Sequence, residues 1–169
     1  MEAPRLSLRH LLAGLEAGVL GTFLMLACVM LGAITNGRSA WVFPNLMATL
    51  FVGRDAYRNE YLNTSLAGVA ILVLIYGVLG VVWGMLVRER NRPGLTVLGA
   101  IVGVAVYYLF FHLIWPQAAP MIPIYAPDRQ LELGHLLWGG ALARSPVFAR
   151  RIAGQEVVPT APEVGEVIL

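Results

Sequence analysis

The sequence predicts an all-α membrane protein, a four-helix transmembrane bundle with both termini in the cytoplasm. Composition is the first reason. Of its 169 residues, 58% are hydrophobic and only 13% are charged, and the mean hydropathy is +0.72, whereas soluble domains carry about 25% charged residues. Patterning is the second reason, because the apolar residues gather in runs long enough to cross a hydrocarbon core of about 30 Å.

Four membrane spans are predicted. The three most apolar ones cover about 11–34, 66–87 and 95–115. Glu16 interrupts the first, and the other two contain no formal charge. A fourth span, about 131–148, is weaker because it contains Glu132, His135 and Arg144.

The distribution of arginine supports counting the fourth span. All twelve basic residues are arginines, and eight of them cluster in three short segments, 1–10, 88–92 and 143–151. The long loop 35–65 carries three spread over some thirty residues, and the third loop carries only Arg129. Short basic connections face the cytoplasm. Both termini and the link between the second and third spans are therefore expected on the inside, which requires an even number of spans.

The connecting segments predict further features. The tight link 88–94 predicts that the second and third spans form an antiparallel hairpin. An apolar segment at 41–53 is too short to span and predicts a short helix lying on the outer surface or dipping into it. The proline-rich segment 115–127 is expected to be extended. The transmembrane domain covers 1–151, and 152–169 is an acidic, proline-containing tail that is either disordered or a docking segment.

Glycines mark the predicted contacts between helices, because small residues at i, i+4 let membrane helices approach closely. The predicted packing positions are Gly14, Gly18, Gly21, Gly77, Gly80, Gly84, Gly99, Gly103 and Gly139. Glu16 lies on the face of its helix opposite the glycines, and a carboxylate at that depth is costly in lipid. Either protein covers both faces, in a homo-oligomer or a larger complex, or Glu16 is protonated or paired with Arg9.

Two histidines form the candidate ligand site. The third span runs outward and ends near His112, and the fourth runs inward from Glu132 and His135, so both histidines are expected near the outer face. Tyr108 shares a helix face with His112. Glu132 and His135, at i, i+3, share a face, so the carboxylate can orient the imidazole or join it on a metal.

Four interpretations of these residues stay open. His112 and His135 are the axial ligands of a haem, or the two histidines and Glu132 bind a metal. They serve in a proton or quinone site, or they are interfacial polar residues that bond one another, backbone or water. A lone Glu-x-x-His does not specify a di-iron site, which needs a second copy and further carboxylates.

Several classes of protein are excluded. No nucleophile has a plausible base, and the sequence contains no Gly-x-Ser-x-Gly, phosphate-loop or His-Glu-x-x-His motif, so an enzyme is not predicted. No basic run is dense enough for nucleic-acid binding. Cys28 is alone in the sequence, which rules out an internal disulfide.

Two segments carry a resemblance to a known family. "GLEAGVLGTFLML" in the first span and "GHLLWGGALA" in the fourth resemble the small four-helix bacterial inner-membrane proteins of the YagU type. The resemblance implies a multi-pass protein of the bacterial inner membrane and singles out Glu16 and His135. The family has no settled biochemical activity, so the resemblance implies no particular one.

The leading functional hypothesis is a non-enzymatic membrane subunit of a larger complex, for example an energy-transducing one, that packs through its first and third spans and its tail. One alternative is a small homo-oligomeric carrier or channel with Glu16 and the two histidines on a polar path. The other is a haem-binding electron-transfer anchor. The expected partners are the lipid bilayer and other membrane subunits, or further copies of the chain.

Overall fold

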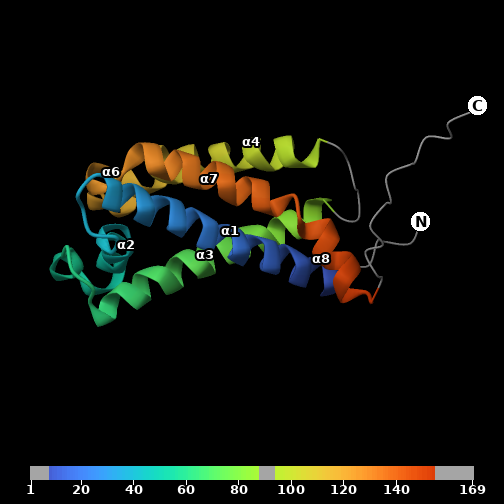
Figure 1. Ribbon diagram of the computed structural model, residues 1–169, viewed down its shortest axis with the longest axis horizontal. Helices are drawn as coiled ribbons and strands as arrows, with labels where there is room; N and C mark the ends of the chain where they lie inside the picture. Colours follow the sequence, from blue (N-terminus) through green and yellow to red (C-terminus); the bar gives the residue numbers. More distant parts are fainter. Residues whose placement is uncertain (1–7, 88–93, 155–169) are drawn as a thin grey trace, which may run out of the picture.

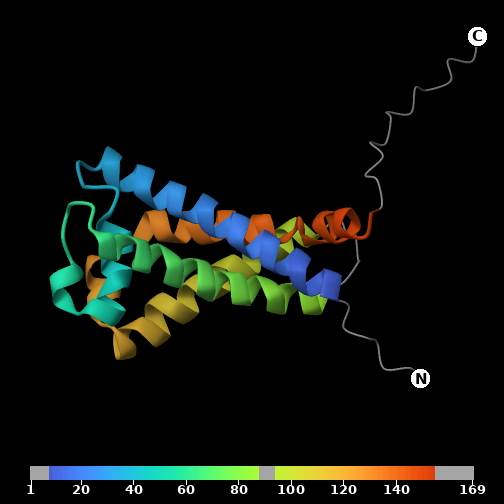
Figure 2. The same cartoon turned by 90° about the horizontal axis from the view of Figure 1, so that it is seen from below.

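The computed structural model describes residues 8–87 and 94–154, and every regular element in these ranges is a helix (Figures 1 and 2). In chain order the helices are α1 (Leu8–Thr35), α2 (Val42–Val52), η1 (Arg54–Ala56), α3 (Asn63–Val87), α4 (Leu95–Tyr108), the π-helix η2 (Leu109–Ile114), α5 (Trp115–Ala118), α6 (Met121–Tyr125), α7 (Asp128–Leu142) and α8 (Ser145–Ile152). The predicted arginine cluster 88–92 and most of the predicted tail, 155–169, lie outside the described residues.

Three helical stretches are long and apolar enough to cross a membrane, namely α1, α3 and the stretch Leu95–Ala118 formed by α4, η2 and α5. They coincide with the first three predicted spans, which indicates a membrane protein. The longest helices run side by side, with α1 packed against both α3 and α7, and α7 packed against α4 (Figure 1).

The molecule has two distinct ends. α1 begins, α3 ends, α4 begins and α8 lies at one end, here called the terminal end (Figures 1 and 2). The opposite end, called the loop end, holds α2, α5 and α6. The chain therefore enters and leaves the described structure at the same end.

Glycines form the contact between α1 and α3. A Cβ at Gly14 would overlap the carbonyl oxygen of Gly80, and one at Gly84 would overlap that of His10. A Cβ at Gly18 would overlap the carbonyl oxygen of Tyr76 and crowd the Cα of Gly80. The two backbones thus touch along several turns, where dispersion contacts rather than water expulsion hold membrane helices together.

The contact between α4 and α7 is built in the same way. Gly99 and Gly139 face one another, and a Cβ on either would overlap the other's carbonyl oxygen. Gly103 lies against the carbonyl oxygen of His135. Gly21, in contrast, does not continue the seam toward α3 but makes room for the indole of Trp138 on α7.

The predicted hairpin of the second and third spans is corrected by this packing. α3 and α4 follow one another in sequence and run in opposite directions, but they do not pack along their lengths. The reason is that their glycines turn toward α1 and α7. Between α3 and α4 lies an apolar groove of about 340 Å³ lined by Trp83, Val102 and Trp138 among others.

The fourth predicted span is not a single helix. α7 has 15 residues and rises about 22 Å at 1.5 Å per residue, less than the apolar core of a bilayer. The chain turns at Ala143 and Arg144, and α8 starts with Pro146 in its first turn, where the missing N–H of proline is tolerated. α8 then packs against the start of α1.

The short helix predicted at 41–53 is present as α2, and it is inserted rather than lying on the surface. Seven consecutive residues from Val42 to Ala48 are buried. The side chain of Asn45 donates to the carbonyl oxygens of Arg58 and Glu60 at 2.7 and 2.8 Å and accepts from the hydroxyl of Ser65. α2 thereby closes the loop end of the molecule.

The segment 115–127 was expected to be extended and is instead partly helical. Pro116 stands in the first turn of α5, where it needs no N–H, and Pro120 precedes α6. These two prolines therefore start short helices without breaking them. α6 packs against α2 at the loop end.

Candidate functional site

Two groups of polar side chains in the described helices are candidates for a functional role. One is a buried group around His135 in the middle of the molecule, and the other is the ion pair of Glu16 near the terminal end. Membrane-embedded polar groups need partners, because lipid offers none.

His135 is fully buried, and both of its ring nitrogens are bonded. Nδ1 lies 2.7 Å from the carbonyl oxygen of Leu131, and Nε2 lies 2.6 Å from the hydroxyl of Tyr76 on α3. Because a carbonyl only accepts, Nδ1 carries the proton, and Nε2 of the neutral imidazole accepts from the tyrosine. The pair ties α7 to α3.

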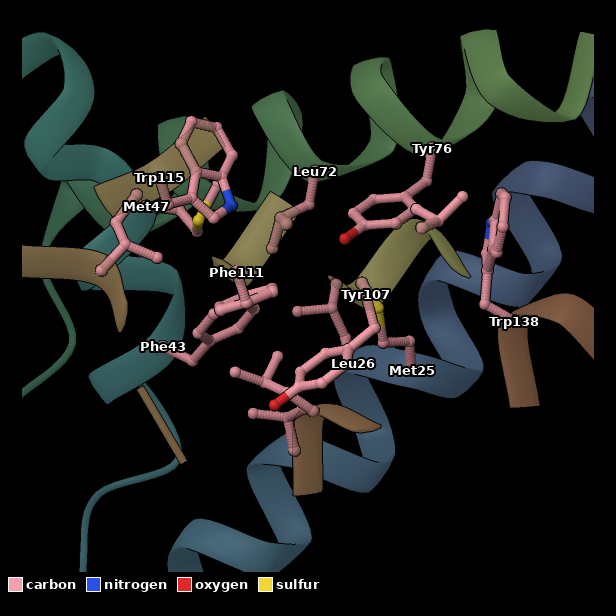
Figure 3. Packing of buried hydrophobic residues seen from close by; sticks show 14 of the residues in the cluster. Met25, Leu26, Phe43, Met47, Leu72, Tyr76, Tyr107, Phe111, Trp115 and Trp138 are labelled. Atoms are coloured by element: carbon pink, nitrogen blue, oxygen red, sulfur yellow. The ribbon is translucent and has the colours of Figure 1, made fainter. Parts of the chain in front are cut away.

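Aromatic rings surround this hydrogen bond. The ring centroids of Tyr76, Tyr107 and Phe111 lie 5.4, 5.4 and 5.8 Å from that of His135, in edge-to-face geometry. Trp138 contacts Tyr76 from the other side at 5.3 Å. Figure 3 shows Tyr76 and Tyr107 entering this interior from α3 and α4, next to Phe43 of α2. Side chains thus fill the interior around His135.

Tyr107 connects the buried group to the start of α7. Its hydroxyl donates to Asp128 in the first turn of that helix. Its ring lies 5.7 Å from the ring of His112 and 5.4 Å from that of His135. The two histidines are therefore both neighbours of Tyr107, which is the link between them.

His112 itself lies on the outside. It is exposed in the π-helix η2 and stacks on exposed Tyr108 at a centroid distance of 5.0 Å. In an α-helix the face of Tyr108 would continue through His112, and here both face outward, as do Ile101 and Ala105. π-helical turns are uncommon and frequently occur at functional positions.

Glu132 is not bonded to His135. It is half-buried on α7. The two ring nitrogens of the histidine are hydrogen-bonded to Leu131 and Tyr76 instead. Within residues 8–87 and 94–154, no group of three His, Cys, Asp or Glu side chains is placed to hold a metal ion. Haem ligation by His112 and His135 stays a prediction, and it would require His135 to release Tyr76.

Glu16 has a partner from the far end of the sequence. Nη2 of Arg151, on α8, donates to Oε1 of Glu16 at 2.9 Å. The carboxylate side chain is 36% exposed and the arginine side chain 69%. The guanidinium also lies over the ring of Phe148, 5.9 Å from its centroid. The pair fixes α8 against α1.

A groove opens beside this ion pair. We call it the α1–α8 groove, with a volume of about 650 Å³, lined by Leu12, Leu15, Glu16, Val19, Leu20, Phe23, Phe148 and Ile152. Leu20 and Phe23 are 42% and 55% exposed. Glu16 is thus a carboxylate in an otherwise apolar, outward-facing surface.

Comparison with known proteins gives no relative from which a role can be transferred. No protein-family model, curated protein or solved structure matches the chain. The function of the chain must therefore be inferred from the two polar groups themselves.

Tyr76 and Arg151 are the partners that sequence reasoning missed. Tyr76 carries a hydroxyl in the middle of an apolar span, and such a group needs an acceptor on another helix. Arg151 follows the fourth predicted span and looks like an ordinary cytoplasmic arginine. Pro146, in the first turn of α8, is the sequence signal for the turn between α7 and α8. This turn places Arg151 beside α1.

Proposed function

We propose that the chain is a non-enzymatic membrane subunit that packs against other membrane protein through the α1–α8 groove. The observation that carries this proposal is Glu16, an ion-paired but partly exposed carboxylate in an apolar, outward surface. A binding surface with one charged pair amid apolar side chains is typical of protein contacts within the membrane.

The depth of Glu16 supports a protein neighbour. It lies eight residues into α1, about 12 Å from the first residue of the helix. A charge inside the hydrocarbon costs several kcal/mol unless it is paired, and even a pair loses its hydration there. Pairing with Arg151 lowers this free-energy cost in part, and a protein that covered the groove would shield the pair from lipid.

The packed interior favours a subunit over the carrier or channel alternative. Glu16 lies near the start of α1, at the terminal end, whereas His112 lies near the far end of the helical stretch Leu95–Ala118. Aromatic rings fill the space around His135 between them. A polar path through these three residues would have to pass this cluster.

We further propose that the fourth predicted span, 131–148, formed by α7 together with the start of α8, completes a four-helix transmembrane bundle in the bacterial inner membrane, with the terminal end in the cytoplasm. The arginines Arg144, Arg150 and Arg151 gather at that end, as cytoplasmic arginines do. The common position of the entering and leaving chain also supports an even number of crossings. The resemblance to the YagU-type proteins points to the same location.

Site-specific photo-crosslinking in native membranes tests the role. A photoreactive residue at Phe23, in the α1–α8 groove, is compared with one at Leu74, which is similarly exposed on the outer face of α3 at 62%. We expect a protein adduct from position 23 and only lipid adducts from position 74. Lipid adducts alone at both positions would show that the groove faces the bilayer and would refute the proposal.

A further inference from the structure

The α1–α8 groove is lined by one acid, Glu16, and the base paired with it, Arg151, directly precedes the lining residue Ile152. We propose that a second copy of this chain fills the groove, with Arg151 of each copy donating to Glu16 of the other. The inference rests on the proposed function, because it names the partner that covers α1.

The ion pair leaves hydrogen-bonding capacity for such an exchange. A guanidinium has five N–H donors, and the bond to Glu16 uses one of them, on Nη2. The Arg151 side chain is 69% exposed, so other donors can reach a second carboxylate. A carboxylate in turn accepts more than one bond, so Glu16 can hold arginines from both copies.

Charge complementarity favours a second copy over other occupants. An anionic lipid headgroup drawn to Arg151 would meet the carboxylate of Glu16 within the same groove. A partner that carries only positive charge would attract Glu16 and repel Arg151, and one that carries only negative charge would do the reverse. Under a two-fold axis, each acid instead faces the base of the other copy, which is the self-complementarity that an isologous contact requires.

The apolar part of the groove suits the same arrangement. Leu12, Leu20 and Phe23 project from α1 and are 44%, 42% and 55% exposed, and Phe148 and Ile152 form the opposite wall. The groove has a volume of about 650 Å³. Leu20 and Phe23 of one copy can therefore insert between α1 and α8 of the other.

A charge exchange between two differently tagged, co-expressed copies tests the inference. Wild type is expected to co-purify with wild type. We expect co-purification of the second copy to be lost when both copies carry E16R, and also when both carry R151E. In each case like charges meet across the contact. E16R with R151E is expected to recover co-purification, since each copy then offers one sign of charge to the other. R129E, at the loop end, is the control and should leave co-purification unchanged.

The mixed pair is the decisive arm. If the ion pair acts only within one chain, each variant is damaged whatever its partner, and mixing restores nothing. That result would overturn the inference, and so would equal recovery of all pairs. A Phe23 adduct to a different polypeptide, without self-association, would overturn the second copy while retaining the proposed subunit. Lipid adducts alone would remove both.

A disulfide test covers the case in which the charge variants do not fold. Leu20→Cys in a chain carrying Cys28→Ala is oxidised in native membranes, and Leu74→Cys in the same background is the control. We expect a disulfide-linked dimer for position 20 and a monomer for position 74. Absence of the dimer at position 20 would contradict the two-fold contact.

Discussion

His135 is held by two hydrogen bonds of different origin, one from its own helix and one from Tyr76 on α3. The bond to Leu131 is local, at i, i−4. The bond to Tyr76 spans 59 positions of sequence and joins helices whose backbones are not in close contact along their lengths. This histidine is therefore first of all a connector between helices, whatever further role it has.

Removing the Tyr76 hydroxyl should destabilise the protein. In Tyr76→Phe the ring packing stays, but Nε2 of His135 is left buried without its donor. We expect a loss of about 1–2 kcal/mol in the free energy of unfolding, measured by thermal unfolding in detergent. Tyr108→Phe, on the exposed face, is the matched control and should change little. Equal stability of the two variants would show that the buried bond contributes nothing.

The sequence pattern predicts His135 on a protein-facing stripe, and the structure buries it there, bonded to Tyr76 and not to Glu132. A helical wheel relates residues of one helix, so it found Glu132 at i−3 and could not find Tyr76. Arg151 was missed for the same reason, since its position beside Glu16 depends on the turn between α7 and α8. Partners across helices follow from three-dimensional packing, which periodicity does not encode.

At the scale of elements, the glycines set which helices touch. Gly14, Gly18 and Gly80 bring α1 and α3 into backbone contact, and Gly99 and Gly139 do so for α4 and α7. The lengths of the first three spans were predictable from hydropathy alone. The pairing of helices was not, because a small-residue seam shows that a face is covered and leaves its neighbour undetermined.

A single methyl group at a seam glycine should separate α1 from α3. In Gly80→Ala the new Cβ would overlap the carbonyl oxygen of Gly14, and the backbone cannot yield as a side chain does. We expect a loss of about 1–3 kcal/mol in stability, measured by thermal unfolding in detergent. Gly140→Ala, where nothing lies within 4 Å of the new atom, should be neutral or slightly stabilising. If both variants unfold like wild type, the close approach of α1 and α3 is wrong.

Loss of the Asn45 amide should loosen the loop end. Asn45→Ala removes the donor to the carbonyls of Arg58 and Glu60 and the acceptor of Ser65. We expect faster tryptic cleavage at Arg54 and Arg58, followed by mass spectrometry of the fragments. Asn36→Ala, whose amide bonds only a neighbouring turn, is the control. Unchanged cleavage would mean that α2 is anchored by its apolar contacts alone.

For the whole molecule, the two ends differ in chemistry. The terminal end holds α8 with Arg150 and Arg151, and the loop end holds α2 and the proline-started turns α5 and α6. This asymmetry is readable from the sequence as a charge bias. The burial of α2 is not, because it depends on which apolar surfaces meet.

The proposed orientation can be checked by cysteine labelling. In a chain with Cys28→Ala, Ser39→Cys at the loop end and Ala153→Cys at the terminal end are treated with a membrane-impermeant maleimide on spheroplasts. Position 39 should react at once, because the proposed orientation exposes the loop end outside the cell. Position 153 should react only after permeabilisation. The reverse pattern would show that the topology is inverted and that the arginine-rich segments of this chain do not face the cytoplasm.

The most direct test of the central claim, that Glu16 and the α1–α8 groove face protein, is the native mass of the purified assembly. The chain is extracted in a mild detergent that retains native lipids, and its mass is measured for wild type and E16R. We predict a wild-type mass well above the 18.4 kDa of one chain and a shift of E16R toward the single chain. A wild-type protein that is entirely monomeric under these conditions would contradict the claim.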